Sequence, residues 1–92
     1  MALSADVILA RIRRVPPGYV TTYGDLSPGA PRLAGAVLSR TGSDVPWWRV
    51  VRADGSLAKG TNQRERLMDE GVPFRRGRVV MDDARIPPEA IH

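Results

Sequence analysis

The chain has 92 residues, which is enough for one domain with a single small hydrophobic core. It has no cysteine, which excludes disulfides, thiolate metal sites and a thiol nucleophile, and its only histidine is the last residue, which argues against histidine-based catalysis. Lysine and arginine outnumber aspartate and glutamate by 14 to 10, a balance that suits a polyanionic partner such as nucleic acid.

The N-terminal segment has the pattern of an amphipathic helix. Apolar residues recur at helical spacing between Leu3 and Val15, and Ser4 is placed to cap the start of the helix. The helix is expected to end at Pro16-Pro17-Gly18, after which Tyr19-Val20 has extended character. The chain shows no signal peptide and no long apolar run, so we expect a soluble cytoplasmic protein that contacts no membrane.

The next segment predicts a helix-turn-helix. Thr22-Tyr23-Gly24-Asp25 matches the Ser/Thr-x-x-acid pattern of a helix start. Pro28-Gly29 predicts a turn, and Pro31 begins a further helix that Gly42 is placed to end. Arg32 then falls in the first turn of the second helix, where such motifs contact nucleic acid. The alternative is a solvent-exposed arginine without a ligand.

The most unusual stretch is Pro46-Trp47-Trp48, ahead of an expected strand at Arg49-Val50-Val51. Tryptophan is large and mostly apolar, and its N–H needs a partner when the ring is buried. Either both indoles fill the core, or one packs inward while its neighbour lines a pocket. On a strand, successive side chains face opposite sides, so the two indoles would not serve one surface.

Two hairpins are expected in the second half of the chain. Asp54-Gly55 predicts a tight turn between residues 49–52 and 56–57, and this hairpin is the expected wing of a winged helix. A second short hairpin is expected within residues 72–81, around Arg75-Arg76-Gly77.

A fourth helix is expected between these hairpins. Asn62 and Glu65 predict its capped start, and Gly71 is placed to end it. The tail from Pro87-Pro88 onward is expected to be loose.

Several motifs, in order and in spacing, resemble the C-terminal domain of O6-alkylguanine-DNA alkyltransferases over residues 4–72. The alkyltransferases have Pro-Cys-His-Arg-Val where this chain has Pro46-Trp47-Trp48-Arg49-Val50. Tryptophan in place of the cysteine is typical of the alkyltransferase-like proteins. The matching motifs are Val15-Pro16-Pro17-Gly18-Tyr19-Val20-Thr21-Thr22-Tyr23-Gly24-Asp25-Leu26, Pro31-Arg32-Leu33-Ala34-Gly35, Val45-Pro46-Trp47-Trp48-Arg49-Val50-Val51 and Glu70-Gly71.

The resemblance implies a single winged helix-turn-helix domain over residues 1–92, α/β but mainly α, with a small β-hairpin wing. It implies binding, through the minor groove, of double-stranded DNA that contains O6-alkylguanine. Arg32 would replace the extruded nucleotide in the base stack. Tyr23, in the Thr22-Tyr23-Gly24 stretch, would crowd the phosphate, and Trp47 would form the floor of the pocket that receives the base.

Four further residues complete the expected DNA and lesion contacts: Thr22, Trp48, Arg49 and Lys59. Trp48 either touches the lesion or fills the space of the enzyme's histidine, and Lys59 either approaches the lesion or faces solvent. Glu70 is expected to be structural. The resemblance implies a monomer associated with the nucleoid that hands the lesion to nucleotide excision repair proteins, with no catalytic residue, metal or cofactor.

Two other classes of function stay open from the sequence. A winged-helix transcription regulator would read DNA sequence instead of a single modified guanine. An alkyltransferase would need a soft nucleophile beside a base, and without cysteine only Tyr23 or Glu70 would be left as acceptor.

Overall fold

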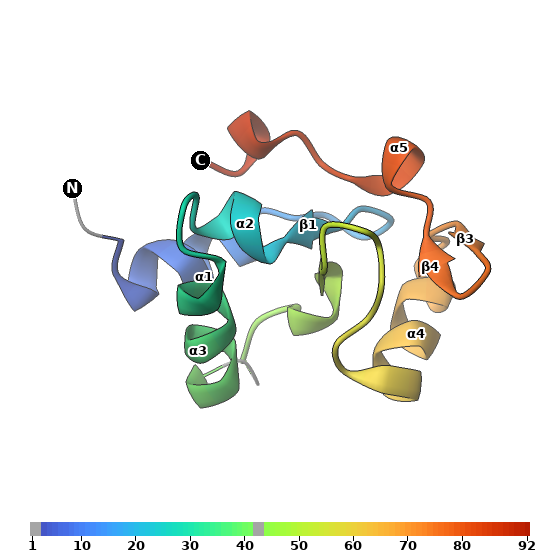
Figure 1. Cartoon of the computed structure of the whole chain (residues 1–92), viewed down its shortest axis with the longest axis horizontal. Coiled ribbons are helices and arrows are strands. Elements are labelled where there is room, and N and C mark those ends of the chain that lie inside the picture. Colours follow the sequence, from blue (N-terminus) through green and yellow to red (C-terminus); the bar gives the residue numbers. More distant parts are fainter. Residues whose placement is uncertain (1–2, 42–43) are drawn as a thin grey trace.

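A computed structural model describes residues 3–41 and 44–92. Figure 1 shows a mainly helical chain in which α1, α2 and α3 lie at one end and α4 and a hairpin at the other. Its elements are α1 (Ala5–Arg13), β1 (Thr21–Thr22), α2 (Tyr23–Leu26), α3 (Pro31–Thr41), the 3₁₀ helix η2 (Trp47–Arg49), β2 (Val50–Val51), α4 (Gly60–Asp69), β3 (Phe74–Arg75), β4 (Arg78–Val79), α5 (Met81–Ala84) and the 3₁₀ helix η3 (Pro88–Ala90).

The helical end follows the expected pattern. Ser4 caps α1 and its side chain accepts a hydrogen bond from the Val7 N–H, which satisfies one of the free donors of the first turn. The side chains of Ile8 and Ile12 are fully buried against Leu26, as the helical spacing predicted. Gly42, the expected end of α3, lies outside the described residues.

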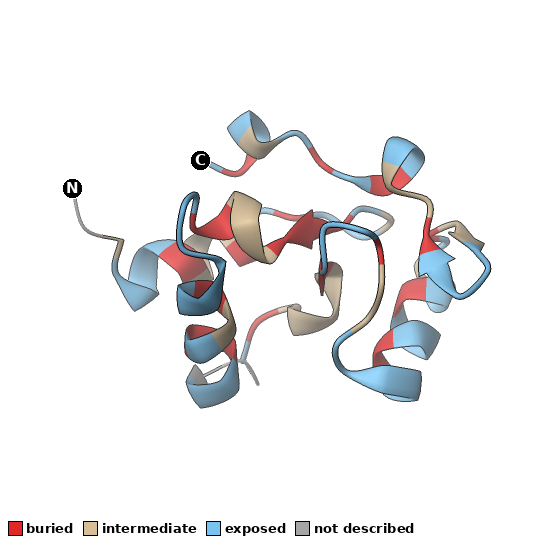
Figure 2. Cartoon of the chain, in the orientation of Figure 1, coloured by how far each residue is buried: buried red, intermediate tan, exposed pale blue. Residues whose placement is uncertain are grey.

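A second cluster of buried side chains lies at the other end of the chain. It joins Val20 and Val51 to α4 and the hairpin, and the buried residues extend through both ends of the molecule (Figure 2). Its members are Val20, Val51, Leu67, Val72, Val79 and Ala84. The two strands between the clusters therefore connect the helix-turn-helix to α4.

The hairpin expected between residues 49–52 and 56–57 is wrong. The tight turn forms, since the Gly55 N–H donates to the Arg52 carbonyl at 2.8 Å, but β2 pairs in parallel with β1, with Val50 opposite Thr21. Val50 and Val51 are both fully buried, one in each cluster. A strand buried on both faces is typical of parallel pairing, not of a half-exposed hairpin.

The antiparallel hairpin of this domain is the second one, as residues 72–81 predicted. Phe74 pairs with Val79 and Arg75 with Arg78, and the turn between them is formed by Arg76 and Gly77. Both turn residues have positive φ, 52° and 79°, the combination that two-residue hairpin turns with the twist of the strands require.

The start expected for α4 at Asn62 is also wrong. The helix begins at Gly60, with Lys59 as the capping residue and no side-chain cap, while the Asn62 side chain accepts a hydrogen bond from Arg66. The Lys59 N–H donates to the Gln63 side chain at 3.0 Å instead. The end of α4 follows the prediction, because Gly71 adopts a φ of 83° that glycine tolerates.

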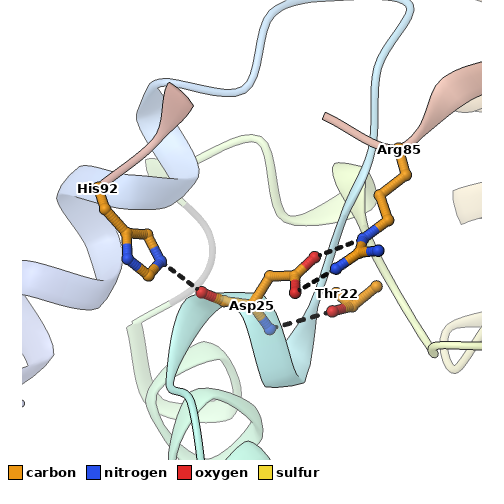
Figure 3. A network of polar contacts seen from close by, with 4 residues as sticks. All are labelled: Thr22, Asp25, Arg85 and His92. Atoms are coloured by element: carbon orange, nitrogen blue, oxygen red, sulfur yellow. Dashed lines mark hydrogen bonds and ion pairs between the residues drawn. The ribbon is translucent and has the colours of Figure 1, made fainter. Parts of the chain in front are cut away.

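The C-terminal tail packs on the domain, so the expectation of a loose tail is wrong. Ile91 is fully buried, and its carbonyl accepts a hydrogen bond from Arg14 at 2.9 Å. Figure 3 shows Arg85 and His92 converging on Asp25 from the tail, with the His92 Nε2 atom 2.6 Å from the Asp25 carbonyl oxygen. None of the helices in the described ranges has the length and apolar character needed to span a bilayer.

Candidate nucleic-acid interface

The helix-turn-helix presents Tyr23 from a well-defined corner. Thr22 is buried and its hydroxyl oxygen accepts the Asp25 N–H at 3.0 Å, which begins α2 at Tyr23. Thr22 therefore acts as a helix cap whose side chain is engaged within the domain. The Ser27 hydroxyl donates to the Ala30 carbonyl at 2.7 Å and sets the turn that leads into α3.

Tyr23 is half-buried and packs between the core and α3. A Cβ atom at Gly35 would lie 4.0 Å from the Tyr23 ring, an ordinary van der Waals distance, so the ring lies next to this position of α3. Burial raises the pKa of the Tyr23 hydroxyl above its usual value, and the nearby Arg52 guanidinium partly opposes this shift. The hydroxyl is thus a neutral hydrogen-bond donor at physiological pH.

Arg32 lies in the first turn of α3 and is exposed. Gly35 follows it by three residues, so Arg32 and the Tyr23 packing position share one side of the helix. Tyr23 and Arg32 therefore lie in the first turns of two consecutive helices, α2 and α3, which pack against each other.

The two tryptophans lie in a 3₁₀ helix, so the expected strand geometry is wrong for them. Trp47–Arg49 forms one turn after Pro46, and the strand begins at Val50. The indole rings meet edge to face with centroids 5.8 Å apart and planes at 88°. Trp47 packs against the helical cluster and Trp48 against the second cluster, so the adjacent rings join the two halves of the core.

Arg66 of α4 covers both indoles, a feature that the sequence patterns did not indicate. Its guanidinium carbon lies 4.8 Å from the centroid of the Trp48 ring and 5.6 Å from that of Trp47. The Asn62 side chain accepts a hydrogen bond from Arg66 Nε at 3.1 Å and orients it. Planar cations over indole faces are favourable contacts, so α4 contributes to the tryptophan site.

Arg49 lies inside the domain and is engaged there. Its Nη2 and Nε atoms bind the two carboxylate oxygens of Glu70 at 2.5 and 3.0 Å, and Nη1 donates to the Val15 carbonyl at 2.9 Å. Its guanidinium carbon is also 5.3 Å from the centroid of the Trp48 ring. Arg49, which was expected at the DNA, instead fixes the tryptophan turn to α4.

Glu70 is ionised by this arrangement. The Arg49 guanidinium lowers the pKa of Glu70, and this effect outweighs the partial burial that would raise it. The Trp48 Nε1–H is buried and has no hydrogen-bond acceptor among the described residues.

Gln63 is a second residue that sequence patterns missed. It is fully buried, and its side-chain nitrogen donates to the carbonyls of Trp48 at 3.1 Å and Val50 at 2.8 Å. Its oxygen accepts the Lys59 N–H, so a single amide ties the tryptophan turn to the start of α4. The available signal is its position four residues before Leu67, on the buried face of the helix.

Lys59 is exposed at the start of α4. One surface hollow lies elsewhere, between the start of α2 and the C-terminal segment, where Thr22, Asp25 and Arg85 line it. Trp47 lines neither this hollow nor the one formed by Arg75, Arg76 and Arg78. Within residues 3–41 and 44–92, no group of three histidine or acidic side chains is placed to hold a metal ion.

Comparisons with known proteins agree on one family. Residues 4–72 match the family described as the 6-O-methylguanine DNA methyltransferase DNA-binding domain. A "DNA base-flipping protein" of Escherichia coli is 43% identical over 72 residues, which cover 66% of this chain and 56% of that protein. The Vibrio parahaemolyticus protein of the same name is 36% identical over 76 residues, which cover 71% of this chain and 76% of that protein.

Among solved structures, the fold is similar to that of S. pombe Atl1 in complex with damaged DNA containing O6-carboxymethylguanine. The TM-score is 0.72 at 22% identity, with 94% of this chain and all of that chain covered. This similarity confirms the expected mainly helical fold with small sheets.

Proposed function

This chain belongs to the family of 6-O-methylguanine DNA methyltransferase DNA-binding domains, and on that premise we propose that it binds O6-alkylguanine in duplex DNA. It turns the damaged nucleotide out of the helix and holds it without removing the alkyl group. The relatives named as DNA base-flipping proteins, and the DNA-bound structure with a similar fold, support this proposal.

The observation that carries the proposal is the position of Tyr23 and Arg32 in the first turns of two helices that pack against each other. Removing a nucleotide from the stack costs a few kcal/mol, so a protein that does this must fill the space and displace the backbone. The exposed guanidinium of Arg32 in the first turn of α3 would enter the stack, and its planar shape suits a place between base pairs. The half-buried Tyr23 ring, which lies next to Gly35, would crowd the adjacent phosphate.

Trp47 is the surface proposed to receive the base. Stacking of a base on an aromatic side chain returns about 1–3 kcal/mol, enough to offset much of the unstacking cost. The ring is only half-buried, and Arg66 and Trp48 hold it from two sides. In this proposal Trp48 and Arg49 support that surface from behind, and Lys59 approaches the base from the start of α4.

We propose no alkyl transfer for this chain, because it offers no suitable acceptor atom. The chain has no cysteine, and Trp47 stands where the alkyltransferase motif has one. Glu70 is ionised but its carboxylate is occupied by Arg49, which makes it a poor nucleophile. A protein that holds the lesion without repairing it needs other proteins to carry out the repair. We therefore further propose transfer of the bound lesion to nucleotide excision repair proteins.

A competition assay tests binding and the absence of transfer together. A duplex whose O6-methylguanine carries a radiolabelled methyl group is incubated with this protein before an active alkyltransferase is added. We expect this protein to stay unlabelled and to delay labelling of the alkyltransferase, and an excess of unmodified duplex of the same sequence to leave this delay in place. Stoichiometric label on this protein, or no delay at saturating protein, contradicts the proposal.

A further inference from the structure

The β3–β4 hairpin carries three arginines within four residues, and no part of the lesion site uses them. Arg75, Arg76 and Arg78 are exposed and together line a shallow hollow on the surface. We propose that this hairpin is the wing of the domain that contacts DNA, and that Arg75 and Arg76 bind the phosphates of the duplex beside the lesion. This inference rests on the proposed function in that duplex DNA is the ligand.

The arginines occupy positions that local energetics disfavour. Arg75 and Arg78 are directly opposite in the antiparallel pair, where like charges destabilise a hairpin. Arg76 is the one described residue other than glycine with positive φ, at a turn position that asparagine or glycine fills at lower cost. Violations of local rules of this kind are expected at functional sites, and a bound polyanion removes the repulsion.

The guanidinium groups are available to a ligand. Within the described part of the chain, Arg75 and Arg76 form no ion pair, and Arg78 has only an exposed contact with Asp54 at 3.7 Å. An exposed pair of this length contributes little stability, so it does not explain the cluster. Planar guanidinium groups suit two-point binding of phosphate oxygens.

The hairpin is hydrogen-bonded to the segment of the chain that leads toward Tyr23. Val79 is buried, and its N–H donates to the Gly55 carbonyl at 2.9 Å. Gly55 belongs to the tight turn that begins at Arg52, and the Arg52 charge acts on the Tyr23 hydroxyl. The exposed Arg52 therefore lies on the segment that links Tyr23 to the hairpin, so a duplex bound at Tyr23 is the polyanion that the hairpin arginines would meet.

The test compares two double variants of the full chain with the same change in net charge. Arg75→Gln with Arg76→Asn removes the two unpaired charges and places asparagine at the positive φ. Arg13→Gln with Arg64→Gln is the control, since both arginines are exposed on helices. Binding to lesion and unmodified duplexes of the same sequence is titrated by fluorescence anisotropy over a series of salt concentrations.

For the hairpin variant we expect the slope of log affinity against log salt to be smaller in magnitude by about two, since each phosphate contact contributes about 0.9. At ~0.1 M salt this corresponds to a loss of roughly tenfold per contact, equal for lesion and unmodified DNA. The control slope should stay close to that of the unmodified protein. The melting temperature of the hairpin variant should be equal or higher, because repulsion and turn strain are reduced.

Several results overturn the inference. One is an unchanged slope for the hairpin variant, and another is an equal fall in slope for the control variant. If the slope of the hairpin variant is unchanged but its binding to polyglutamate is lost, the hairpin binds an acidic protein instead. Failure of the proposed function is a separate result, since it appears as equal binding of the unmodified protein to lesion and undamaged duplexes. The slopes of the two variants on undamaged DNA still decide the role of the hairpin in that case.

Discussion

Arg49 and Glu70 form a two-point ion pair beneath the tryptophan turn, with Nη2–Oε2 and Nε–Oε1 distances of 2.5 and 3.0 Å. Both side chains are largely buried, at 12% and 16% exposure. The pair joins η2 to the end of α4, so the position of both indoles depends on it.

We expect Glu70→Gln to destabilise the domain by about 3 kcal/mol near neutral pH, because it leaves the Arg49 charge without its partner. Arg49 lowers the pKa of Glu70 below 4.5, so the stabilisation is complete above about pH 4.5 and is lost as the pH falls through the folded-state pKa. Denaturant melts of both proteins between pH 3 and pH 7 should therefore converge in acid. A constant difference in unfolding free energy across this range would contradict the assignment.

Arg66→Ala should remove the cation from the faces of Trp47 and Trp48. Contacts of this kind are worth about 0.5–1 kcal/mol each at exposed sites, so a loss of about 1 kcal/mol in unfolding free energy is expected. Arg64→Ala, on the same helix but without an aromatic contact among the described residues, is the matched control. Tryptophan emission should shift to longer wavelength in the first variant only; identical spectra would mean that Arg66 does not cover the rings in solution.

A pair of substitutions at Tyr23 separates crowding from hydrogen bonding. Tyr23→Phe keeps the ring, so lesion affinity should fall by only about twofold to tenfold, since a single neutral hydrogen bond contributes about 0.5–1.5 kcal/mol. Tyr23→Ala removes the ring that packs near Gly35 and should cost more than tenfold. Circular dichroism checks that the Ala variant is folded at the temperature of the titration. Equal losses for both variants would show that the hydroxyl, not the ring, carries the effect.

Returning a cysteine to the motif tests why transfer chemistry is missing. Trp47→Cys alone should accept little or no radiolabelled alkyl group, because a thiol with a pKa of about 8.5 is mostly protonated at neutral pH. Adding Trp48→His supplies a base beside the sulfur, so the double variant should become labelled faster. Trp48→His alone is the control and should stay unlabelled; label on it would place the acceptor outside the motif.

Local signals in the sequence predicted much of this domain. The Ser4 and Thr22 caps, and the turn at Arg76-Gly77, were predictable because each depends on residues a few positions apart. The positions of Tyr23 and Arg32 at the starts of their helices follow from the same signals together with the family resemblance.

Features that depend on distant partners were not predictable in this way. The parallel pairing of Val50 with Thr21 requires knowledge that both faces of the strand are covered. The burial of Ile91 depends on the distant helix that carries Arg14. The place of Arg66 over the indoles depends on how α4 packs against η2, which no short pattern encodes.

The central claim is that the domain recognises one modified base by exchanging it for Arg32. Equilibrium titration of the protein and of Arg32→Ala with O6-methylguanine and guanine duplexes of identical sequence tests this claim directly. The protein should prefer the lesion duplex, and Arg32→Ala should lose that preference by more than the uniform weakening expected for one phosphate contact. Equal affinity of the unmodified protein for both duplexes, or a preference that survives in Arg32→Ala, would contradict it.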